Sequence, residues 1–267
     1  MESTLTLKKQ DFQVRVASNL GWGLGPDHGD PEWSTQKKFQ LKDFVDSGYR
    51  QFLTTPPIQG FHPGAYKWSF LHPMATMTLA AGASTLLLPD DFGGAEGHLF
   101  ISTAGSSGFT LRFGGAGHVY AAEQAMPTTT GMPTTAFIEA IKGTTILHGQ
   151  KMQLRLWPIA DQEYTLQFAY YLHPNALTDV SPYAYGAADH SETILESCLS
   201  VAELRLDDIA NGPHKQQFML LLAGSIRADQ RKKPQYGGYN GDWSEGLEYG
   251  GRARGLGRIK YNGVLYD

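Results

Sequence analysis

The stretch from residue 151 to residue 208 constrains the fold more than any other part of the chain. Apolar and polar residues alternate over Met152–Trp157 and again over Tyr164–Tyr170, with a Pro-Ile-Ala-Asp turn between the two runs. This alternation is typical of strands that bury one face, so the sequence predicts a β-hairpin. After a proline-containing linker the spacing becomes helical. The positions that share this helical spacing are Ile194, Leu195, Cys198, Ala202 and Arg205.

Four helix starts are marked by residues that favour them. Thr6 and Ser34 are placed to cap two N-terminal helices, and Pro213 is placed to open the last one. Asp189 precedes Glu192 by three residues, which is the spacing of a capping box. The inner faces of the first, second and last helices are predicted to be Phe12, Val16 and Leu20; Leu41, Phe44, Val45, Gly48, Tyr49 and Phe52; and Phe218, Leu221, Leu222 and Ile226. Each helix needs partners to bury its apolar face, so we expect a four-helix bundle.

Short extended runs separated by Gly, Pro and Asp lie between the helices, as in a small antiparallel β domain. Besides the hairpin, the predicted strands are Met74–Leu79, Thr85–Leu88, Leu99–Thr103, Phe109–Phe113 and Thr135–Ile141. They predict a β-sandwich or partial barrel inserted into the bundle. A single helical turn is expected at His118–Gln124 and an exposed loop at residues 126–135.

The predicted fold class is therefore α+β, in four segments. Residues 1–57 and 183–235 supply the N-terminal and C-terminal helices of the bundle, residues 58–182 form the inserted β domain, and residues 236–267 form an extended arm. The arm contains nine of the 31 glycines. Its predicted contact residues, on a neighbouring subunit or another surface, are Tyr236, Tyr239, Trp243, Tyr249, Arg252, Arg254, Arg258, Tyr261 and Tyr266. A solvated tail and an RNA-binding Gly-Arg tail are the alternatives.

Composition limits the classes of function. The net charge is −4, whereas a protein that binds nucleic acid by neutralising phosphates needs clustered Lys and Arg, so tight general nucleic-acid binding is not expected. A single cysteine excludes an internal disulfide framework. No apolar run resembles a signal peptide or a membrane span, so a reducing cytoplasm is the expected compartment.

The candidates for chemistry favour structural roles. Asp189-His190-Ser191 has the residue types of a hydrolytic triad, but successive helical residues point in different directions, so a helix cap is expected. On that interpretation, His190→Ala costs at most about 1 kcal/mol. His62, His72 and His173 each precede a proline, and their spacing matches no metal site.

Three further candidates are also interpreted structurally. Cys198 lies on the apolar stripe of a helix, and the adjacent Asp90 and Asp91 belong to a turn sequence that runs on through Phe-Gly-Gly. The closely spaced glycines of residues 21–25 are neither preceded by a strand nor followed by a Lys-Ser/Thr pair, so a loop is expected rather than a phosphate cradle, with Gly21 ending the first helix. No catalytic, metal or cofactor site is predicted.

A series of short motifs, in order along the chain, resembles the head-to-tail adaptor proteins of tailed bacteriophages. The motifs are Leu-Gly-Trp-Gly at 20–23, Ser-Gly-Tyr-Arg-Gln-Phe at 47–52 with Pro-Pro shortly after, Tyr-Lys-Trp-Ser-Phe-Leu at 66–71, Leu-Pro-Asp-Asp-Phe-Gly-Gly at 88–94, Leu-Trp-Pro at 156–158 with Tyr-Thr-Leu and Tyr-Tyr after it, Asn-Ala-Leu-Thr-Asp at 175–179 and His-Ser-Glu-Thr-Ile-Leu-Glu-Ser-Cys at 190–198. The resemblance covers roughly residues 5–241. More distantly, the chain resembles the tail tubular proteins of short-tailed phages, in which a helical bundle carries an inserted β domain.

The resemblance implies a structural virion protein at the head–tail junction, made in the host cytoplasm. It implies a twelve-copy ring beneath the portal protein, a contact with the next tail or nozzle component, and a lumen through which DNA passes. The channel-facing surface is expected to be neutral or acidic, because DNA must slide past it. The family has no catalytic residues to carry over.

Two other classes remain open. One is a β-sandwich ligand- or carbohydrate-binding module in which Trp22, Trp33, Trp68, Trp157 and Trp243 act as stacking platforms, although core packing is the expected role of Trp68 and Trp157. The other is an enzyme of unrecognised type, which requires convergent polar groups in a deep pocket.

Overall fold

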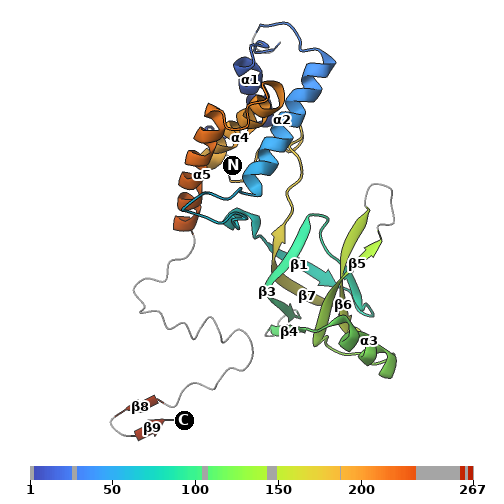
Figure 1. Cartoon of the computed structure of the whole chain (residues 1–267). Helices are drawn as coiled ribbons and strands as arrows, with labels where there is room; N and C mark the ends of the chain where they lie inside the picture. The colour runs from blue at the N-terminus through green and yellow to red at the C-terminus, as the bar shows by residue number, and fades with distance from the viewer. Residues whose placement is uncertain are drawn as a thin grey trace. The chain divides into compact units, whose positions relative to one another are not determined.

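The computed structural model describes residues 3–25, 29–103, 108–142, 149–186 and 188–232, together with the backbone of residues 259–261 and 264–266. The chain divides into two units, Met1–Lys232 and Lys233–Asp267. The first unit contains five α-helices and a seven-stranded, barrel-like sheet in its described residues (Figure 1). The α+β class is thus confirmed.

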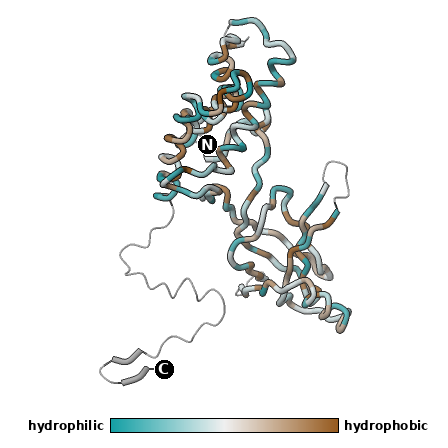
Figure 2. The backbone as a smooth tube through the Cα atoms, in the orientation of Figure 1, coloured by the Kyte–Doolittle hydropathy of each residue, from teal (hydrophilic) through white to brown (hydrophobic). Residues whose placement is uncertain are grey.

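Four helices pack together in the first unit: α1 (Lys9–Asn19), α2 (Thr35–Leu53), α4 (Ala188–Leu206) and α5 (Pro213–Lys232). Helix α4 contacts each of the other three, and α1 also contacts α2. The predicted inner face of α2 is confirmed, since all six of its residues are buried. Along the helices, apolar residues are interleaved with hydrophilic ones, so each helix has a face to bury (Figure 2).

Glycine permits the close approach of α2 to α4. A Cβ atom added at Gly48 would lie 2.5 Å from the Cα atom of Cys198, which is a backbone clash. At the same crossing the Ser197 hydroxyl donates a hydrogen bond to the Gly48 carbonyl at 2.7 Å. The small residues at this crossing therefore bring the two backbones into contact.

Two predicted helix starts differ slightly from the observed ones, at Thr6 and at Asp189. Thr6 is buried before α1, which begins at Lys9, because the N–H of Leu7 donates to the Ser191 hydroxyl (3.2 Å) and that of Lys9 donates to the Pro182 carbonyl (2.8 Å). These contacts with distant segments fix the entry to the helix. By contrast, the Ser34 cap of α2 is confirmed, with its hydroxyl accepting from the Lys37 N–H at 3.3 Å.

Asp189 lies inside the first turn of α4 rather than in front of it, because the helix begins at Ala188. The Glu192 carboxylate accepts a hydrogen bond from Arg15 of α1 at 2.9 Å, where the sequence predicted a capping box. Glu192 thus takes part in a tertiary ion pair between α1 and α4. The helical spacing itself is confirmed, because Ile194, Cys198 and Ala202 are buried.

The sheet has the strand order β1-β7-β3-β4-β5-β6-β2. Its strands are β1 (Met74–Leu79), β2 (Thr85–Leu87), β3 (Phe92–Ser102), β4 (Phe109–Phe113), β5 (Thr135–Lys142), β6 (Gln150–Trp157) and β7 (Tyr164–Leu172). All neighbours are antiparallel except β4 and β5, which are parallel. Strands β1 and β2 form the two edges.

The predicted hairpin of residues 151–170 is wrong in its pairing. Both strands exist, but β6 pairs with β5 and β2, whereas β7 pairs with β1 and β3. The connection between them is held by other loops, since Ile159 bonds to Thr129 and Gly131, and Ala160 bonds to Gly82 and Ala83. With this connection, β6 and β7 lie next to opposite edges of the sheet, β6 beside β2 and β7 beside β1.

Two elements are longer than the sequence predicted. Strand β3 begins at Phe92, so the expected turn stops at Asp91, and register shifts between Phe92 and Gly94 and between Glu96 and Phe100 hide the strand period. Helix α3 (Ala116–Ala125) is a full helix where a single turn was expected, and its residue Val119 is buried. The sheet is therefore more continuous than its sequence pattern suggests.

The second unit contains two short strands, β8 (Ile259–Tyr261) and β9 (Val264–Tyr266), which pair with each other in antiparallel fashion. Within the described ranges, no helix has both the length and the apolar character needed to cross a bilayer.

Candidate interaction surfaces

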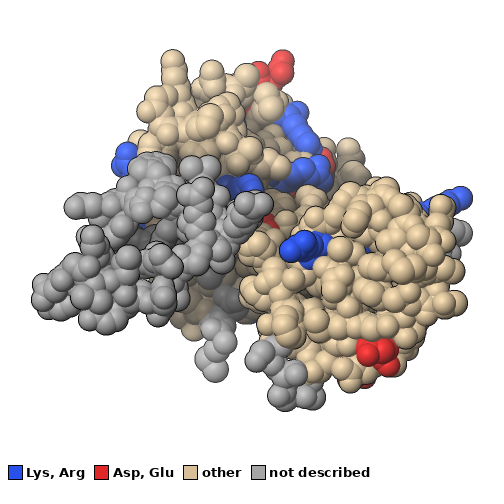
Figure 3. All heavy atoms as spheres, turned by 90° about the horizontal axis from the view of Figure 1, so that it is seen from below, with Lys and Arg blue, Asp and Glu red and all other residues tan. Residues whose placement is uncertain are grey.

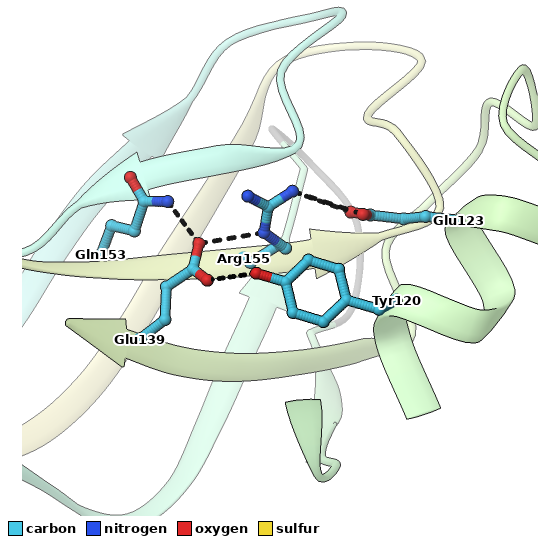
Figure 4. A network of polar contacts seen from close by, with 5 residues as sticks. All are labelled: Tyr120, Glu123, Glu139, Gln153 and Arg155. Atoms are coloured by element: carbon cyan, nitrogen blue, oxygen red, sulfur yellow. Dashed lines mark hydrogen bonds and ion pairs between the residues drawn. The ribbon is translucent and has the colours of Figure 1, made fainter. Parts of the chain in front are cut away.

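A network of charged side chains lies on the outside of the sheet, where α3 packs on β5 and β6 (Figure 4). Glu139 of β5 is its centre. Its carboxylate accepts hydrogen bonds from Arg155 Nε at 3.0 Å, from the Tyr120 hydroxyl at 2.7 Å and from the Gln153 amide. Arg155 also reaches Glu123 of α3 at 3.3 Å and lies over the Tyr120 ring, 5.0 Å from its centroid. The network thereby attaches α3 to two strands.

The electrostatics of this network favour the ionised state of Glu139. Burial alone would raise the pKa of Glu139, but the hydrogen bonds from Gln153, Tyr120 and Arg155, with the charge of Arg155, outweigh it and hold the pKa below its ordinary value of 4.5. The same contact raises the pKa of Tyr120, whose hydroxyl donates to this carboxylate. The network therefore has a structural role, because its hydrogen-bond donors and acceptors are paired with one another.

A second polar centre is buried where α5 contacts the segment before the sheet. The carboxylate of Asp229 is inaccessible to solvent and accepts hydrogen bonds from the Tyr66 hydroxyl (2.9 Å), the Ser69 hydroxyl (2.5 Å) and the Ser69 N–H (3.1 Å). Burial, followed by this hydrogen bond, raises the pKa of Tyr66. Asp229 thus fixes the last turns of α5 against the chain that leads into β1.

A groove of about 900 Å³ lies beside Asp229 and is lined by Tyr49 of α2 and by residues 175–178 and 180–186, which belong to the connection from the sheet to α4. The Tyr49 hydroxyl accepts a hydrogen bond from the Tyr185 N–H at 3.0 Å, and burial raises the pKa of Tyr49. Val180, on the rim, is 97% exposed. The groove is lined by aromatic, apolar and polar groups without a cluster of titratable side chains, which fits a contact surface better than a reaction site.

Exposed apolar side chains also occur on the sheet. Phe100 of β3 and Phe109 and Phe113 of β4 are each 43–55% exposed. On the face shown in Figure 3, the described Lys, Arg, Asp and Glu side chains are scattered among uncharged residues. Phe100 pairs with Thr110, so it lies on the opposite face of the sheet from Phe109 and Phe113. Exposed apolar side chains of this kind are suited to contact with another protein.

The predicted arm residues fall almost entirely outside the part of the chain that the structure describes. These are Tyr236, Tyr239, Trp243, Tyr249, Arg252, Arg254 and Arg258. Tyr261 and Tyr266 lie on the backbone of β8 and β9, at positions paired with Val264 and Ile259. Their role in contacts remains a prediction.

In the triad-like motif His190 and Ser191 are buried and serve packing, whereas Asp189 is exposed. The ring of His190 is inaccessible to solvent and lies between the rings of Phe52, Trp68 and Phe70, with centroids 5.2–5.8 Å away. Ser191 accepts the bond from Leu7 described above. This packing leads us to expect a larger cost for His190→Ala than the limit of about 1 kcal/mol that follows from a role at the helix start.

The other chemical candidates do not converge. Among the described residues, no group of three or more His, Cys, Asp or Glu side chains is placed to hold a metal ion. Cys198 is buried, and this burial raises the pKa of its thiol. Asp90 pairs with Lys151 at 3.1 Å, whereas Asp91 accepts from the Tyr170 hydroxyl at 3.2 Å. The two carboxylates thus have separate structural partners.

Tryptophans do not form stacking platforms in the described part of the chain. Trp68 is fully buried, and Trp22 and Trp33 are half-buried against the core. Trp157 is half-buried too, with its indole nitrogen inaccessible to solvent. This arrangement does not favour a carbohydrate-binding module. Trp243 lies outside the described residues.

Comparison with known families identifies the chain. Residues 9–240 match the family model of the SU10 adaptor protein. The chain belongs to the SU10 adaptor family. It is thus a bacteriophage adaptor, a structural component of the virion that contacts other head or tail proteins, and the family is not one of enzymes. No protein of curated function matches the chain.

Sequence reasoning missed both polar centres of this adaptor. Gln153 and Arg155 were recognised only as the polar positions of a strand, and Glu139 only as part of another strand. Glutamate and arginine on the outward faces of two neighbouring strands were a signal, but the sequence assigned β6 to the wrong neighbour. Asp229 gave no signal, because it stands among basic residues near a helix end.

Proposed function

We propose that the chain forms an adaptor ring in the phage neck, joining the portal protein to the next tail or nozzle component, with DNA passing through its lumen. The observation that carries this proposal is the family match over residues 9–240, which spans the helices, the sheet and the start of the arm.

The two-part fold of the first unit is compatible with a ring. A ring is built from heterologous contacts, so each subunit must present two different surfaces to its neighbours and further surfaces to the components above and below. We propose that the packed helices form a four-helix bundle, which provides one kind of surface. The sheet, with its exposed Phe100, Phe109 and Phe113, provides chemically different surfaces. Twelve copies is the proposed number, as the resemblance implies.

The arm is proposed to extend onto a neighbouring subunit or the portal. Aromatic side chains give a large contact area at a small cost in rotamer entropy, which suits Trp243 and the arm tyrosines as anchors. The net charge of −4 is compatible with a lumen that DNA crosses without being held.

Assembly with the portal tests this function. The full chain is mixed with its portal protein, and the product is analysed by native mass measurement and by electron cryomicroscopy. The expected product is a closed ring of twelve copies on the portal. Chains that remain monomeric in the presence of portal would overturn the proposal. Salt-sensitive, submicromolar binding of linear duplex DNA by the isolated chain would contradict the proposed lumen.

A further inference from the structure

One edge of the sheet has backbone groups available to a further strand. Strand β1 is at the end of the strand order and pairs only with β7 among the described strands. The Tyr170 N–H donates to the Pro73 carbonyl at 3.2 Å. Because bonding direction alternates along an antiparallel pair, Ala75, Met77 and Leu79 face β7, and the N–H and C=O groups of residues 74, 76 and 78 face the open edge.

This edge lacks the usual protection against pairing. Proteins block sheet edges with charged residues, proline, bulges or very short strands. Strand β1 has six residues, Met-Ala-Thr-Met-Thr-Leu, with no charge and no proline. Met74, Thr76 and Thr78 are exposed, with Met74 at 65%. The other edge strand, β2, has only three residues. Strand β1 is therefore the better acceptor for an added strand.

The second unit of the chain contains a candidate donor. Strands β8 and β9 have three residues each and pair only with each other in the described backbone. A lone two-stranded hairpin is at best marginally stable in water. Its sequence, Ile-Lys-Tyr and Val-Leu-Tyr, is rich in residues that favour strands. Joining the edge of a larger sheet would supply the hairpin with a third strand.

We propose that the β8–β9 hairpin of one copy adds to the β1 edge of a neighbouring copy, so that a sheet continues from one subunit to the next. The 26 residues from 233 to 258 can span up to roughly 90 Å when extended, which is enough to reach a neighbour. Donor and acceptor are different surfaces of the same chain, as a head-to-tail ring requires. This contact rests on the proposed ring and specifies one of its interfaces.

Cysteine cross-linking in assembled rings tests the contact. Leu265→Cys of β9, or Lys260→Cys of β8 opposite it, is combined in turn with a Cys at each β1 position from 74 to 79 in the full chain, so that one pair comes within disulfide range whichever strand is added and in whichever register. The native Cys198 is buried and does not interfere. Mild oxidation of rings on the portal should give a ladder of covalent dimers and larger products for at least one pair. A fast-migrating intramolecular product, or no cross-linked product from any of these pairs, overturns the proposal.

A matched pair controls for accidental collisions. The control variant combines Leu265→Cys with Thr110→Cys. Thr110 is exposed, as Thr76 and Thr78 are, but it lies on β4, a strand that pairs with both β3 and β5. We expect no ladder from it. A ladder as strong as that of the β1 pairs would show that the hairpin is not specific for the open edge and would overturn the proposal.

Removing one backbone donor gives a second test. Thr76→Pro removes an N–H that faces the open edge while leaving the bonds to β7, whereas Thr76→Val keeps that N–H. The expected result is at least tenfold weaker association between subunits for the proline variant and less than a twofold change for valine. Unchanged association of a folded Thr76→Pro protein would overturn the contact alone. Failure of the wild-type chain to form rings on the portal would overturn the proposed function itself.

Discussion

At the scale of single residues, the buried carboxylate of Asp229 is expected to contribute strongly to the free energy of unfolding. Asp229→Ala would leave the hydroxyls of Tyr66 and Ser69 and the Ser69 N–H without their acceptor in a buried site. We expect a loss of about 2–4 kcal/mol in the free energy of unfolding, measured by urea denaturation.

The matched control for that substitution is Asp43→Ala. Asp43 pairs with Arg205 between α2 and α4, but its side chain is 49% exposed, so the loss should stay below about 1 kcal/mol. Equal losses at the two positions would contradict the role assigned to the buried carboxylate.

Glu139 links the stability of the sheet to pH. Because its pKa in the folded protein lies below the ordinary value of 4.5, its ionised form contributes stability above that pH, and the contribution is lost as the pH falls through the folded-state pKa. Glu139→Gln should therefore lower the free energy of unfolding by about 1–3 kcal/mol at pH 7 and by much less near pH 3.

Urea denaturation at both pH values measures this difference. Glu163→Gln, at an exposed position of the same protein, should have little effect at either pH. A Glu139→Gln effect as large at pH 3 as at pH 7 would show that the ionised carboxylate is not the source of the stability.

His190 provides a test of aromatic packing. Its ring is inaccessible to solvent among Phe52, Trp68 and Phe70, so His190→Ala removes a large buried side chain. Core truncations of this size cost about 2–5 kcal/mol, and the melting temperature should fall accordingly. A cost below about 1 kcal/mol would restore the interpretation of this residue as part of a helix start.

Burial of single residues was predictable where it follows a period. The stripe from Leu41 to Phe52 was identified because helical spacing alone determines which side of α2 faces inward. The partners of Asp229 were not predictable, since Tyr66 and Ser69 lie about 160 positions away in the sequence. A local pattern carries no information about such a distant contact.

At the scale of elements, the crossing of α2 and α4 depends on one glycine. Gly48→Ala would place a Cβ atom 2.5 Å from the Cα atom of Cys198, so the helices must move apart. We expect a destabilisation of at least about 2 kcal/mol, although alanine is the better helix former by about 1 kcal/mol.

Gly224 of α5 is the matched control, because a Cβ atom there meets no atom within 4 Å. Gly224→Ala should leave stability unchanged or raise it by up to about 1 kcal/mol. Thermal unfolding of both variants separates the two effects. Similar melting temperatures for the two would show that the close approach of α2 and α4 is easily relaxed.

Strand pairing shows why elements are easier to predict than their neighbours. The alternation in β6 and β7 correctly indicated two strands with one buried face each, because period two reports the side on which a residue lies. It does not report the partner strand, and the bonds of Ile159 and Ala160 to residues 82–83 and 129–131 send β7 elsewhere. In β3, two register shifts conceal even the period.

At the scale of the whole molecule, family membership and structure complement each other. The family identifies a phage adaptor, and the structure shows which surfaces such an adaptor could offer, namely the groove beside Asp229, the exposed phenylalanines of β3 and β4, and the open edge of β1. None of these surfaces could be predicted from the sequence. The groove and the exposed phenylalanines combine residues from separate elements, and the open edge of β1 depends on which strands pair. The arm stays a prediction that rests on composition.

The proposed arm can be tested by deleting it from the whole molecule. Deleting residues 236–267 removes a segment outside the compact unit Met1–Lys232, so the truncated protein should stay folded and soluble with a nearly unchanged melting temperature. Heads that carry the truncated protein should nevertheless fail to join tails, or should leak DNA, because the aromatic anchors and the hairpin are gone. Deleting only residues 259–267 removes the hairpin and keeps Trp243, and so separates the subunit contact from the remaining anchors. Particle yield and DNA retention measure both variants, and normal yield with the longer deletion would show that the arm is dispensable.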